Sequence, residues 1–273
     1  MPELPEVETV RRSAEQKIVG RRVTAASVRH PGILDGVSAA ALEALFVGNT
    51  VTSIGRRGKY LIFRFETGEE LLLHLRMTGQ LIAFDDAFAG DRHCHLVVSF
   101  ERGGFFYRDV RRFGRFCVAG TGGKTEEGFK KLGYEPMDRE FTVRYVKEGL
   151  AGRRCPVKAR ILDQCFIAGI GNIYADEILF RAGIHPLRRC DELTGRQIQR
   201  LKKACETVLL EAIEHRGTTF RDFRDGYGET GGHQEHLAVF HRAGEPCLLC
   251  GTAIEETKCA GRTTSFCPKC QKR

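Results

Sequence analysis

The sequence predicts an α+β protein with an N-terminal antiparallel β-sandwich and flanking helices, followed by a C-terminal helical domain and a zinc ribbon. Three observations support this fold class. Between residues 51 and 118, short segments rich in β-branched and aromatic residues are separated by Gly and acidic turns. Beyond about residue 132, apolar residues recur at helical spacing. Two CxxC pairs follow, at 247–250 and 267–270.

Composition indicates a globular protein and excludes a membrane-spanning one. At 273 residues, with 42% of them hydrophobic, the chain is long enough for two domains of ordinary size. Its longest apolar runs are far shorter than the ~18 residues that a membrane helix needs. The first residues also lack the basic start and the apolar stretch of an export signal. We therefore expect a cytoplasmic protein with no membrane partner.

The formal net charge of +8 favours a polyanionic partner, because clustered Lys and Arg neutralise phosphates and release counterions. Nucleic acid is one interpretation of this charge, and a merely basic, solvated surface is the alternative. The 11 cysteines are an odd number in a chain without an export signal. Metal ligation and buried thiols are therefore better interpretations than disulfides.

The first predicted element is a helix in PEVETVRRSAEQKIVG. Val7, Val10, Ala14 and Ile18 recur there at helical spacing, and Gly20 offers a stop. The segments predicted as antiparallel strands are KYLIFRFE, ELLLHLRM, HLVVSF, GGFFYRD and GRFCVA. The segment at 130–140, KKLGYEPMDRE, is the predicted linker between the strand-rich and helical halves.

The second half contains two short helical candidates, VKARILDQCF and NIYADEILFRAG, joined by IAGIG. A long helix runs through TGRQIQRLKKACETVLLEAIEHRG, with Thr194 and Gln197 in capping-box spacing and Gly217 as terminator. Its predicted apolar face holds Ile198, Leu201, Cys205, Val208 and Leu209. The segment 217–236 is rich in glycine and has no period, which favours a long mobile loop with a function, or else plain disorder.

The pattern CxxC-x16-CxxC predicts one structural zinc ion held by Cys247, Cys250, Cys267 and Cys270. Each CxxC turn brings two thiolates toward one ion, and four thiolates complete a tetrahedron with no open position. A redox role for either pair is the alternative, and Cys259 is a competing ligand. Lys258 and Arg262 lie near the predicted tip of this ribbon, where they either meet phosphates or belong to a solvated hairpin.

The opening MPELPE suggests a nucleophile. Removal of Met1 would leave Pro2 with a free secondary amine, which titrates at about 7.7 to 8.0, so a fraction is neutral at pH 7. Lys59 or another nearby cation would raise that fraction. Attack on a sugar's anomeric carbon would yield a permanently charged iminium, and Glu3 and Glu6 are candidate acids beside it. The alternative is that Pro and Glu simply stabilise a helix start.

The chain resembles the bacterial formamidopyrimidine-DNA glycosylases, which excise oxidised purines. The resemblance is carried by PELPEVETVRR, GRRGKYLIF, HLRMTGQL, DVRRFGRF, IAGIGNIYADEILF, GIHP and AGRTTSFCPKCQ, in the family's order. It covers essentially the whole chain. The related glycosylases for oxidised pyrimidines typically open with PEGPE, so PELPEVE favours the purine branch.

The resemblance implies a role for particular residues. Pro2 would be the nucleophile, Glu3 the acid that assists ring opening, Glu6 a supporting residue, and Lys59 a group that reaches the lesion and its phosphate. Met77, Arg111 and Phe113 would fill the gap left by an extruded base, and Arg111 and Phe113 are expected to point the same way from one strand. The residues expected to contact DNA are His74, Met77, His93, Arg111, Phe113, Asn172, Lys258 and Arg262.

The region around GIGN resembles the family's helix-two-turn-helix, in which Asn172 either donates to a phosphate or serves as an ordinary N-cap. The expected domains are therefore a catalytic sandwich at 1–132, a helical domain at 133–236 with a lesion-covering loop at 217–236, and a zinc ribbon at 237–273. The chain departs from the family at His236, Phe240 and His241, where Glu, Tyr and Gly are usual. These departures put the lesion spectrum in question, and their histidines suggest pH-sensitive activity.

Together these observations predict a bifunctional glycosylase and abasic-site lyase of base excision repair. It would excise 8-oxoguanine and formamidopyrimidines from duplex DNA through a Schiff base on Pro2, and then cleave the strand by β- and δ-elimination. Its expected partner is duplex DNA with oxidised purines or abasic sites, and it is expected to act as a monomer in the bacterial cytoplasm, at the nucleoid. The alternatives are a zinc-dependent protein that binds damaged DNA without chemistry, and a glycosylase for oxidised pyrimidines.

Overall fold

The computed structural model describes every residue except 87, 89 and 221, and its chain forms two compact units. The first unit comprises Met1–Lys131 and His215–Gln234, and the second comprises Leu132–Glu214 and Glu235–Arg273. The first boundary lies within the predicted linker at 130–140. Because His215–Gln234 packs with the first unit after a long excursion, we call it the returning segment.

Within the described residues, the first unit contains two four-stranded antiparallel sheets, which confirms the predicted sandwich. One sheet has the order β1-β6-β7-β5, formed by Val23–Val28, Cys94–Phe100, Gly104–Asp109 and Gly79–Phe84. The other has the order β2-β3-β4-β8, formed by Val51–Arg57, Tyr60–Phe65, Glu70–His74 and Arg115–Val118. Phe63 and Phe105, one from each sheet, are fully buried and stack with ring centroids 6.2 Å apart. Such apolar contacts between facing sheets form the core.

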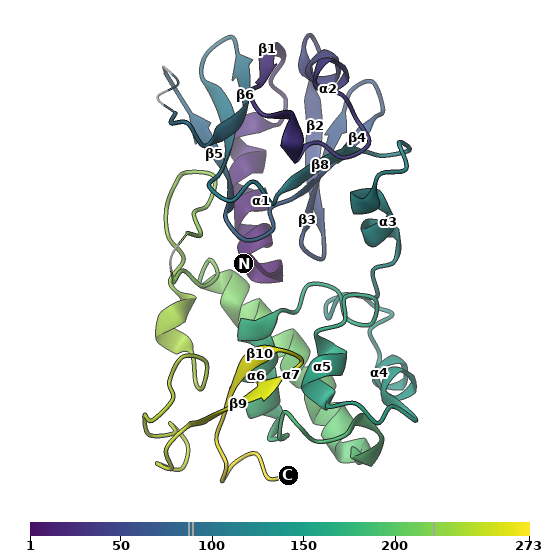
Figure 1. Ribbon diagram of the computed structural model, residues 1–273, viewed down its shortest axis with the longest axis vertical. Coiled ribbons are helices and arrows are strands. Elements are labelled where there is room, and N and C mark those ends of the chain that lie inside the picture. Colours follow the sequence, from purple (N-terminus) through teal and green to yellow (C-terminus); the bar gives the residue numbers. More distant parts are fainter. Residues whose placement is uncertain (87, 89, 221) are drawn as a thin grey trace. The chain divides into compact units, whose positions relative to one another are not determined.

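Helix α1, Leu4–Ile18, forms as the sequence predicts, with Val7, Val10, Ala14 and Ile18 buried in the same core. Figure 1 shows it between β5 and β2, which are the edge strands of the two sheets. The helix therefore covers one open side of the sandwich. The unit's other helical elements are η1 (Pro31–Ile33), α2 (Ala39–Phe46) and α3 (Lys124–Lys130).

The second unit is helical, as expected. It contains α4 (Val143–Leu150), α5 (Val157–Ile161), α6 (Asn172–Ala182), η2 (Cys190–Glu192) and α7 (Gly195–Glu214), while η3 (His233–His236) lies where the returning segment ends. Thr194 and Gln197 form the predicted capping box at the start of α7, because each backbone N–H donates to the other's side chain, at 3.0 and 3.3 Å. The predicted apolar face of α7 is buried.

The chain's last two strands, β9 (Glu255–Cys259) and β10 (Arg262–Phe266), pair as an antiparallel hairpin, as expected for a ribbon. Ala260 and Gly261 form its two-residue turn, with φ of 50° and 73°. Two positive φ values are typical of the type I′ turn, whose twist matches that of the strands. None of the helices in the described part of the chain is long and apolar enough to cross a membrane.

Candidate functional site

The start of the chain is buried and held in place. Met1 is 47% exposed, whereas Pro2 and Glu3 are buried. The backbone N–H of Glu3 donates to the carboxylate of Glu6 at 2.8 Å, and a proline lies in the first turn of α1. The acids and prolines of MPELPE thus fix the helix start, as the simpler interpretation requires. The hydrogen bond from Glu3 to Glu6 also fixes the residue that follows Pro2.

Glu6 also connects the chain start to the returning segment. Its other oxygen accepts the backbone N–H of Thr218 at 2.7 Å. Gly217 precedes this contact with φ of +75°, and a Cβ there would lie 2.7 Å from the Glu6 carboxylate. Only glycine combines this conformation with such a close approach. Glu6, which the sequence predicts as an acid beside Pro2, therefore also positions the backbone, since both of its carboxylate oxygens accept backbone N–H groups.

The returning segment makes further hydrogen bonds within the first unit. The N–H of Gly226 donates to the Ser13 hydroxyl at 2.8 Å, and its carbonyl accepts the N–H of Ala83 at 2.9 Å. The Asp225 carboxylate accepts the backbone N–H groups of Tyr227 and Glu229, each at 2.9 Å. Polar groups hold this segment, which explains why the sequence shows no apolar period there.

Lys59 lies on the two-residue turn between β2 and β3 and is 5% exposed. Gly58, with φ of 57°, provides the bend. The Arg56 guanidinium donates to the Gly58 carbonyl at 3.2 Å and to the Glu8 carboxylate of α1 at 3.0 Å. Glu8 and Arg56 therefore support the turn that carries Lys59. Sequence reasoning missed both, although Glu8, Arg11 and Arg12 at helical spacing were a readable signal.

His74 faces Tyr60 across β3 and β4, and the two rings lie 4.5 Å apart. Its Nδ1 accepts the backbone N–H of Arg76 at 3.0 Å. Burial lowers the pKa of His74 to about 3, and the charges of Arg76 and Lys59 add to this effect. The ring is therefore neutral at pH 7 with its proton on Nε2, so it can donate one hydrogen bond close to Lys59.

Met77, Arg111 and Phe113 form one exposed cluster. Met77 is 42% and Phe113 44% exposed, so neither side chain belongs to the core. Nη1 of Arg111 lies 3.2 Å from the sulfur of Met77, and its guanidinium lies 4.5 Å from the centre of the Phe113 ring. The expectation that Arg111 and Phe113 share a strand is wrong, because β7 ends at Asp109 and both residues follow in a turn.

The carboxylate of Asp109 organises that turn. It accepts the N–H of Gly114 at 2.8 Å, the N–H of Arg111 at 3.1 Å and the hydroxyl of Tyr107 at 3.0 Å. Thr78, next to Met77, donates its hydroxyl to the same group. Burial opposes ionisation of Asp109, but these hydrogen bonds outweigh it and hold the pKa below its ordinary value. Sequence reasoning missed Asp109.

His93, just before β6, is half-buried. Its backbone N–H donates to Asp91 at 2.8 Å, and its carbonyl accepts the N–H of Asp109 at 3.0 Å. The ring atom Nδ1 is buried and has no hydrogen-bond partner within the described residues. The backbone contact connects His93 to the same Asp109 that holds the Arg111 turn.

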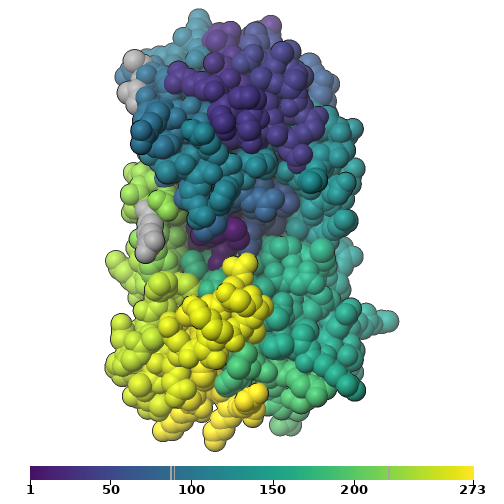
Figure 2. All heavy atoms as spheres, in the orientation of Figure 1, coloured from purple at the N-terminus to yellow at the C-terminus, as the bar shows by residue number. Residues whose placement is uncertain are grey.

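In the second unit, Asn172 is the first residue of α6 and Gly171 is the N-cap, so the interpretation of Asn172 as an ordinary N-cap is wrong. Its amide Nδ2 donates to the carbonyl of Thr263 on β10 at 3.0 Å. Lys258 donates to the hydroxyl of Thr263 at 2.6 Å, and Arg262 is exposed beside it. Three of the predicted DNA contacts therefore gather at the ribbon tip, around Thr263. Figure 2 shows the ribbon, in yellow, at the surface of its unit.

Two adjacent acids on α6 fix the ribbon to the helices. Asp176 pairs with Lys158 of α5 at 2.7 Å, with both side chains fully buried, and accepts the N–H of Ser265 at 3.0 Å. The carboxylate of Glu177 accepts three consecutive N–H groups, at 238–240, within 2.8–2.9 Å. Burial raises the pKa of both acids, although the ammonium of Lys158 favours the charged form of Asp176. This pair was not recognised in the sequence.

The four cysteines of the CxxC pairs meet as predicted. Their sulfur atoms all lie within 4.8 Å of one another, with Cys247 and Cys270 at 3.9 Å and Cys250 and Cys267 at 3.5 Å. A tetrahedral zinc ion with bonds of about 2.3 Å places its sulfur ligands about 3.8 Å apart, so the four thiols fit one structural ion. Cys259 lies on β9 and is not a member of this group.

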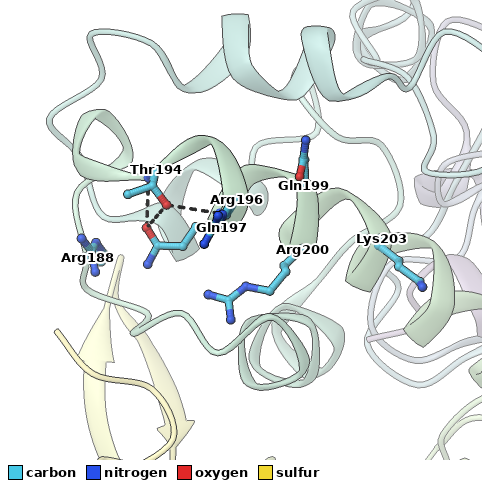
Figure 3. A pocket seen from close by; sticks show the side chains of 7 residues that line it. All are labelled: Arg188, Thr194, Arg196, Gln197, Gln199, Arg200 and Lys203. Carbon is cyan, nitrogen blue, oxygen red and sulfur yellow. Dashed lines mark hydrogen bonds between the residues drawn. The ribbon is translucent and has the colours of Figure 1, made fainter.

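A surface pocket of about 740 Å³ lies at the start of α7 (Figure 3). Its lining is formed by Arg188, Thr194, Arg196, Gln197, Gln199, Arg200 and Lys203. Every charged lining residue is a cation, and Thr194 and Gln197 are those of the capping box. These cations contribute to the positive charge of the second unit. No sequence motif predicted the pocket.

Three protein-family models match the chain. The formamidopyrimidine-DNA glycosylase N-terminal domain matches residues 1–116, and the family's H2TH (helix-two-turn-helix) domain matches residues 132–224. A zinc finger found in this glycosylase and in IleRS matches residues 244–273. These matches include the chain start, α6 and the ribbon described above.

Individual relatives agree with the family models. The formamidopyrimidine-DNA glycosylase of Pelotomaculum thermopropionicum is 42% identical, and the alignment covers 100% of this chain and 99% of that one. The Lactococcus lactis Fpg, solved in complex with DNA containing an abasic site, is 36% identical, with a TM-score of 0.91 over 99% of this chain and 100% of that one. A mutant of the same protein, solved with DNA containing Fapy-dG, also gives a TM-score of 0.91 at 36% identity, over 100% of both chains.

Proposed function

Because the chain belongs to the formamidopyrimidine-DNA glycosylase family, we propose that it is a bifunctional DNA glycosylase and abasic-site lyase of base excision repair. It excises oxidised purines, such as 8-oxoguanine and formamidopyrimidines, from duplex DNA. The observation that carries this proposal is the chain start, where Pro2 and Glu3 are buried and Glu6 fixes the backbone that follows them.

Pro2 supplies the nucleophile once Met1 has been removed, which the exposure of Met1 favours. The neutral amine attacks the anomeric carbon, and the bond to the damaged base breaks; the base leaves with the bonding electrons and takes up a proton. Glu3 protonates the sugar oxygen as the ring opens. The nitrogen loses its only proton, so the resulting iminium keeps its positive charge. That charge acidifies the adjacent C–H bond. Elimination then releases the 3′ phosphate, and a second elimination releases the 5′ phosphate.

Lys59 and His74 contact the lesion strand in this proposal. Lys59 is a cation on a supported turn, and His74 is a neutral donor beside it. A cation and a donor at one place suit a phosphate oxygen. Since His74 is neutral, it does not add a second charge that would repel Lys59.

Met77, Arg111 and Phe113 fill the space left by the extruded base. Extrusion costs a few kcal/mol of stacking and pairing, which apolar side chains inserted into the duplex offset. Arg111 is the residue of the cluster that can hydrogen-bond the orphaned base on the other strand. Their exposure and mutual contacts support this role. We also assign His93 to the residues that contact DNA, because its carbonyl accepts the N–H of Asp109, the residue that holds the Arg111 turn.

The second unit holds the DNA backbone. Asn172, Lys258 and Arg262 cluster at Thr263, where two cations and a helix start attract phosphates. One zinc ion, bound by the four cysteines, is structural and fixes the ribbon that presents these residues. The proposed domains along the sequence are a catalytic one at 1–132, a helical one at 133–236 and the ribbon at 237–273. The lesion-covering loop at 217–236 follows the helices in the sequence, but as far as Gln234 it packs with the first unit. The enzyme acts as a monomer on DNA, in the bacterial cytoplasm at the nucleoid.

A strand-cleavage assay tests this function and separates it from its competitors. Duplexes carry 8-oxoguanine opposite cytosine, an oxidised pyrimidine, or no lesion, and the Pro2→Gly variant serves as control. We expect base release and a gap with phosphate at both ends on the first duplex, and loss of both by Pro2→Gly. Zinc-dependent binding without any base release would instead indicate a damage-binding protein. Preferential cleavage at the pyrimidine would indicate the other branch of glycosylases.

A further inference from the structure

Two cysteines outside the zinc site face each other in the second unit. The segment before α5 and the segment that contains η2 pair through an antiparallel bridge between Pro156 and Arg189. Val157 donates to the Arg188 carbonyl at 2.8 Å, and Cys190 donates to the Cys155 carbonyl at 3.1 Å. Cys155 and Cys190 are therefore directly opposed, one residue beyond the bridge. Their sulfur atoms lie 3.9 Å apart.

This position meets the geometric needs of a disulfide. Opposed residues of a hydrogen-bonded antiparallel pair have Cα atoms about 5.5 Å apart, which is also the usual Cα separation across a disulfide. The sulfur atoms must approach from 3.9 Å to about 2.05 Å. Rotation of the two side chains can supply this movement, and the bridge is an isolated one rather than part of a sheet.

The two thiols differ in access. Cys155 is exposed and follows two arginines, whereas Cys190 is 2% exposed. Burial, together with the neighbouring Cys155, raises the pKa of Cys190. An oxidant from solvent therefore reaches Cys155 first, and Cys190 is the protected thiol behind it.

We propose that Cys155 and Cys190 are a peroxide-oxidised pair that closes a reversible disulfide in the helical unit. The Cys155 thiolate attacks one oxygen of hydrogen peroxide, the O–O bond breaks, and hydroxide leaves, which takes up a proton to become water. The sulfenic acid on Cys155 is then attacked by the sulfur of Cys190. The S–O bond breaks, an S–S bond forms, and the hydroxyl leaves as a second water with the proton of Cys190. Two thiols are oxidised and one peroxide is reduced.

The bond would tie together the two ends of segment 155–190, which holds α5 and α6 with Lys158, Asn172, Asp176 and Glu177. Cross-linking these ends restricts the unfolded chain of the helices that hold the ribbon. Peroxide also oxidises purines, so the bond would form under the conditions in which the lesions arise. The disulfide forms whichever lesion the enzyme prefers.

The test is titration of the zinc-loaded, full-length protein with hydrogen peroxide, followed by alkylation and peptide mapping without reductant. We expect a linked pair of peptides containing Cys155 and Cys190, which separates on treatment with dithiothreitol. The thermal midpoint of the oxidised protein should rise relative to the reduced protein, and Cys190→Ser should abolish both the link and the rise. Cys165→Ser is the matched control, because Cys165 is an exposed thiol of the same unit, and it should change neither result.

Three results would overturn the proposal. One is oxidation of Cys155 to sulfinic acid with Cys190 left as a thiol. Another is a link from Cys155 to a different cysteine. The third is loss of zinc at a peroxide dose that leaves Cys155 and Cys190 reduced, since the zinc cysteines would then be the sensitive ones.

Discussion

The chain start in the first unit and the ribbon in the second are each held by a buried carboxylate that accepts backbone N–H groups. The functional groups that the two regions present are different. Glu6 accepts two backbone N–H groups, one beside Pro2 and one in the returning segment. Glu177 accepts three, at the entrance to the ribbon. In both places a buried carboxylate fixes backbone from distant parts of the sequence. The first places Pro2 in a buried position, and the second presents cations at the surface.

The two regions also differ in what stabilises them. The first unit has an extensive core of aliphatic and aromatic side chains from both sheets and α1. The ribbon contributes to a small cluster that includes Phe180, Val239, Ile254 and two zinc cysteines. A core this small supplies little burial free energy, so a metal ion must supply the rest. The comparison indicates that packing stabilises the first unit, whereas a metal ion and buried charge stabilise the ribbon.

Removal of zinc should have the largest effect and should act on one region only. Cys267→Ser is expected to unfold the ribbon and abolish DNA binding, because the apparent binding energy of structural zinc, about 10–16 kcal/mol, is largely folding energy. The first unit should stay folded. Zinc content, DNA affinity and limited proteolysis measure this. Cys259→Ser is the control, because Cys259 is a buried ribbon cysteine outside the metal group, and equal zinc loss in both variants would contradict the assignment.

Substitution of the two carboxylates should separate chemistry from binding. Glu6→Gln removes charge-assisted hydrogen bonds worth about 1.5–3 kcal/mol, so we expect single-turnover base release to slow by about 10-fold to 160-fold. Affinity for DNA with a stable abasic analogue should change little. Glu177→Gln should weaken that affinity and leave the single-turnover rate at saturating DNA intact. If the two variants lose rate and affinity in the same proportion, the division between the regions is wrong.

Acidic pH should lower the free energy of unfolding of the first unit, because Asp109 becomes protonated. Its folded pKa lies below the ordinary 3.8, so its contribution to the free energy of unfolding is complete above that pH. The contribution is lost as the pH falls through the folded pKa. Urea unfolding between pH 2.5 and 6 should therefore show a steeper decline below about pH 4 in the native protein than in Asp109→Asn. Parallel curves for the two proteins would show that Asp109 does not hold the turn.

The smallest expected effect concerns His241, which stands where the family usually has glycine. Its φ is 61°, a left-handed conformation that costs a residue with a side chain about 1 kcal/mol. His241→Gly relieves this strain but adds freedom to the unfolded chain, so stability should change by at most about 1 kcal/mol. Thermal unfolding measures it. DNA affinity measured from pH 5.5 to 8 checks the histidine hypothesis, because a flat profile in the native protein would reject it.

The sequence predicts the fold well where the pattern is local. The apolar period of α1, the capping box of α7 and the cysteine spacing each depend on residues close in the chain. The contacts that it does not predict join distant residues, such as Glu6 with Thr218 or Asp176 with Ser265. A buried acid has no signature that distinguishes it from a surface acid. Glu177 reads as an ordinary helix residue until its three N–H partners are known.

The site follows the same division. MPELPE identifies the candidate nucleophile and its acids, because the residue types themselves carry the chemistry. Met77, Arg111 and Phe113 come together because Asp109 holds the turn that carries Arg111. Alternation along a strand, which the sequence suggested, does not bring them together. His74 and Lys59 are predicted as contacts, but only the structure shows that burial and Lys59 keep His74 neutral.

Borohydride trapping identifies the nucleophile directly, because it reduces the iminium to a stable bond. The protein is reduced on duplex DNA that carries 8-oxoguanine opposite cytosine, and the adduct is digested and mapped, with Pro2→Gly beside it. We expect a covalent adduct on the nitrogen of Pro2, found only in chains without Met1, and none in the variant. An adduct on Lys59, or no adduct on either this DNA or an abasic duplex despite tight binding, would contradict it.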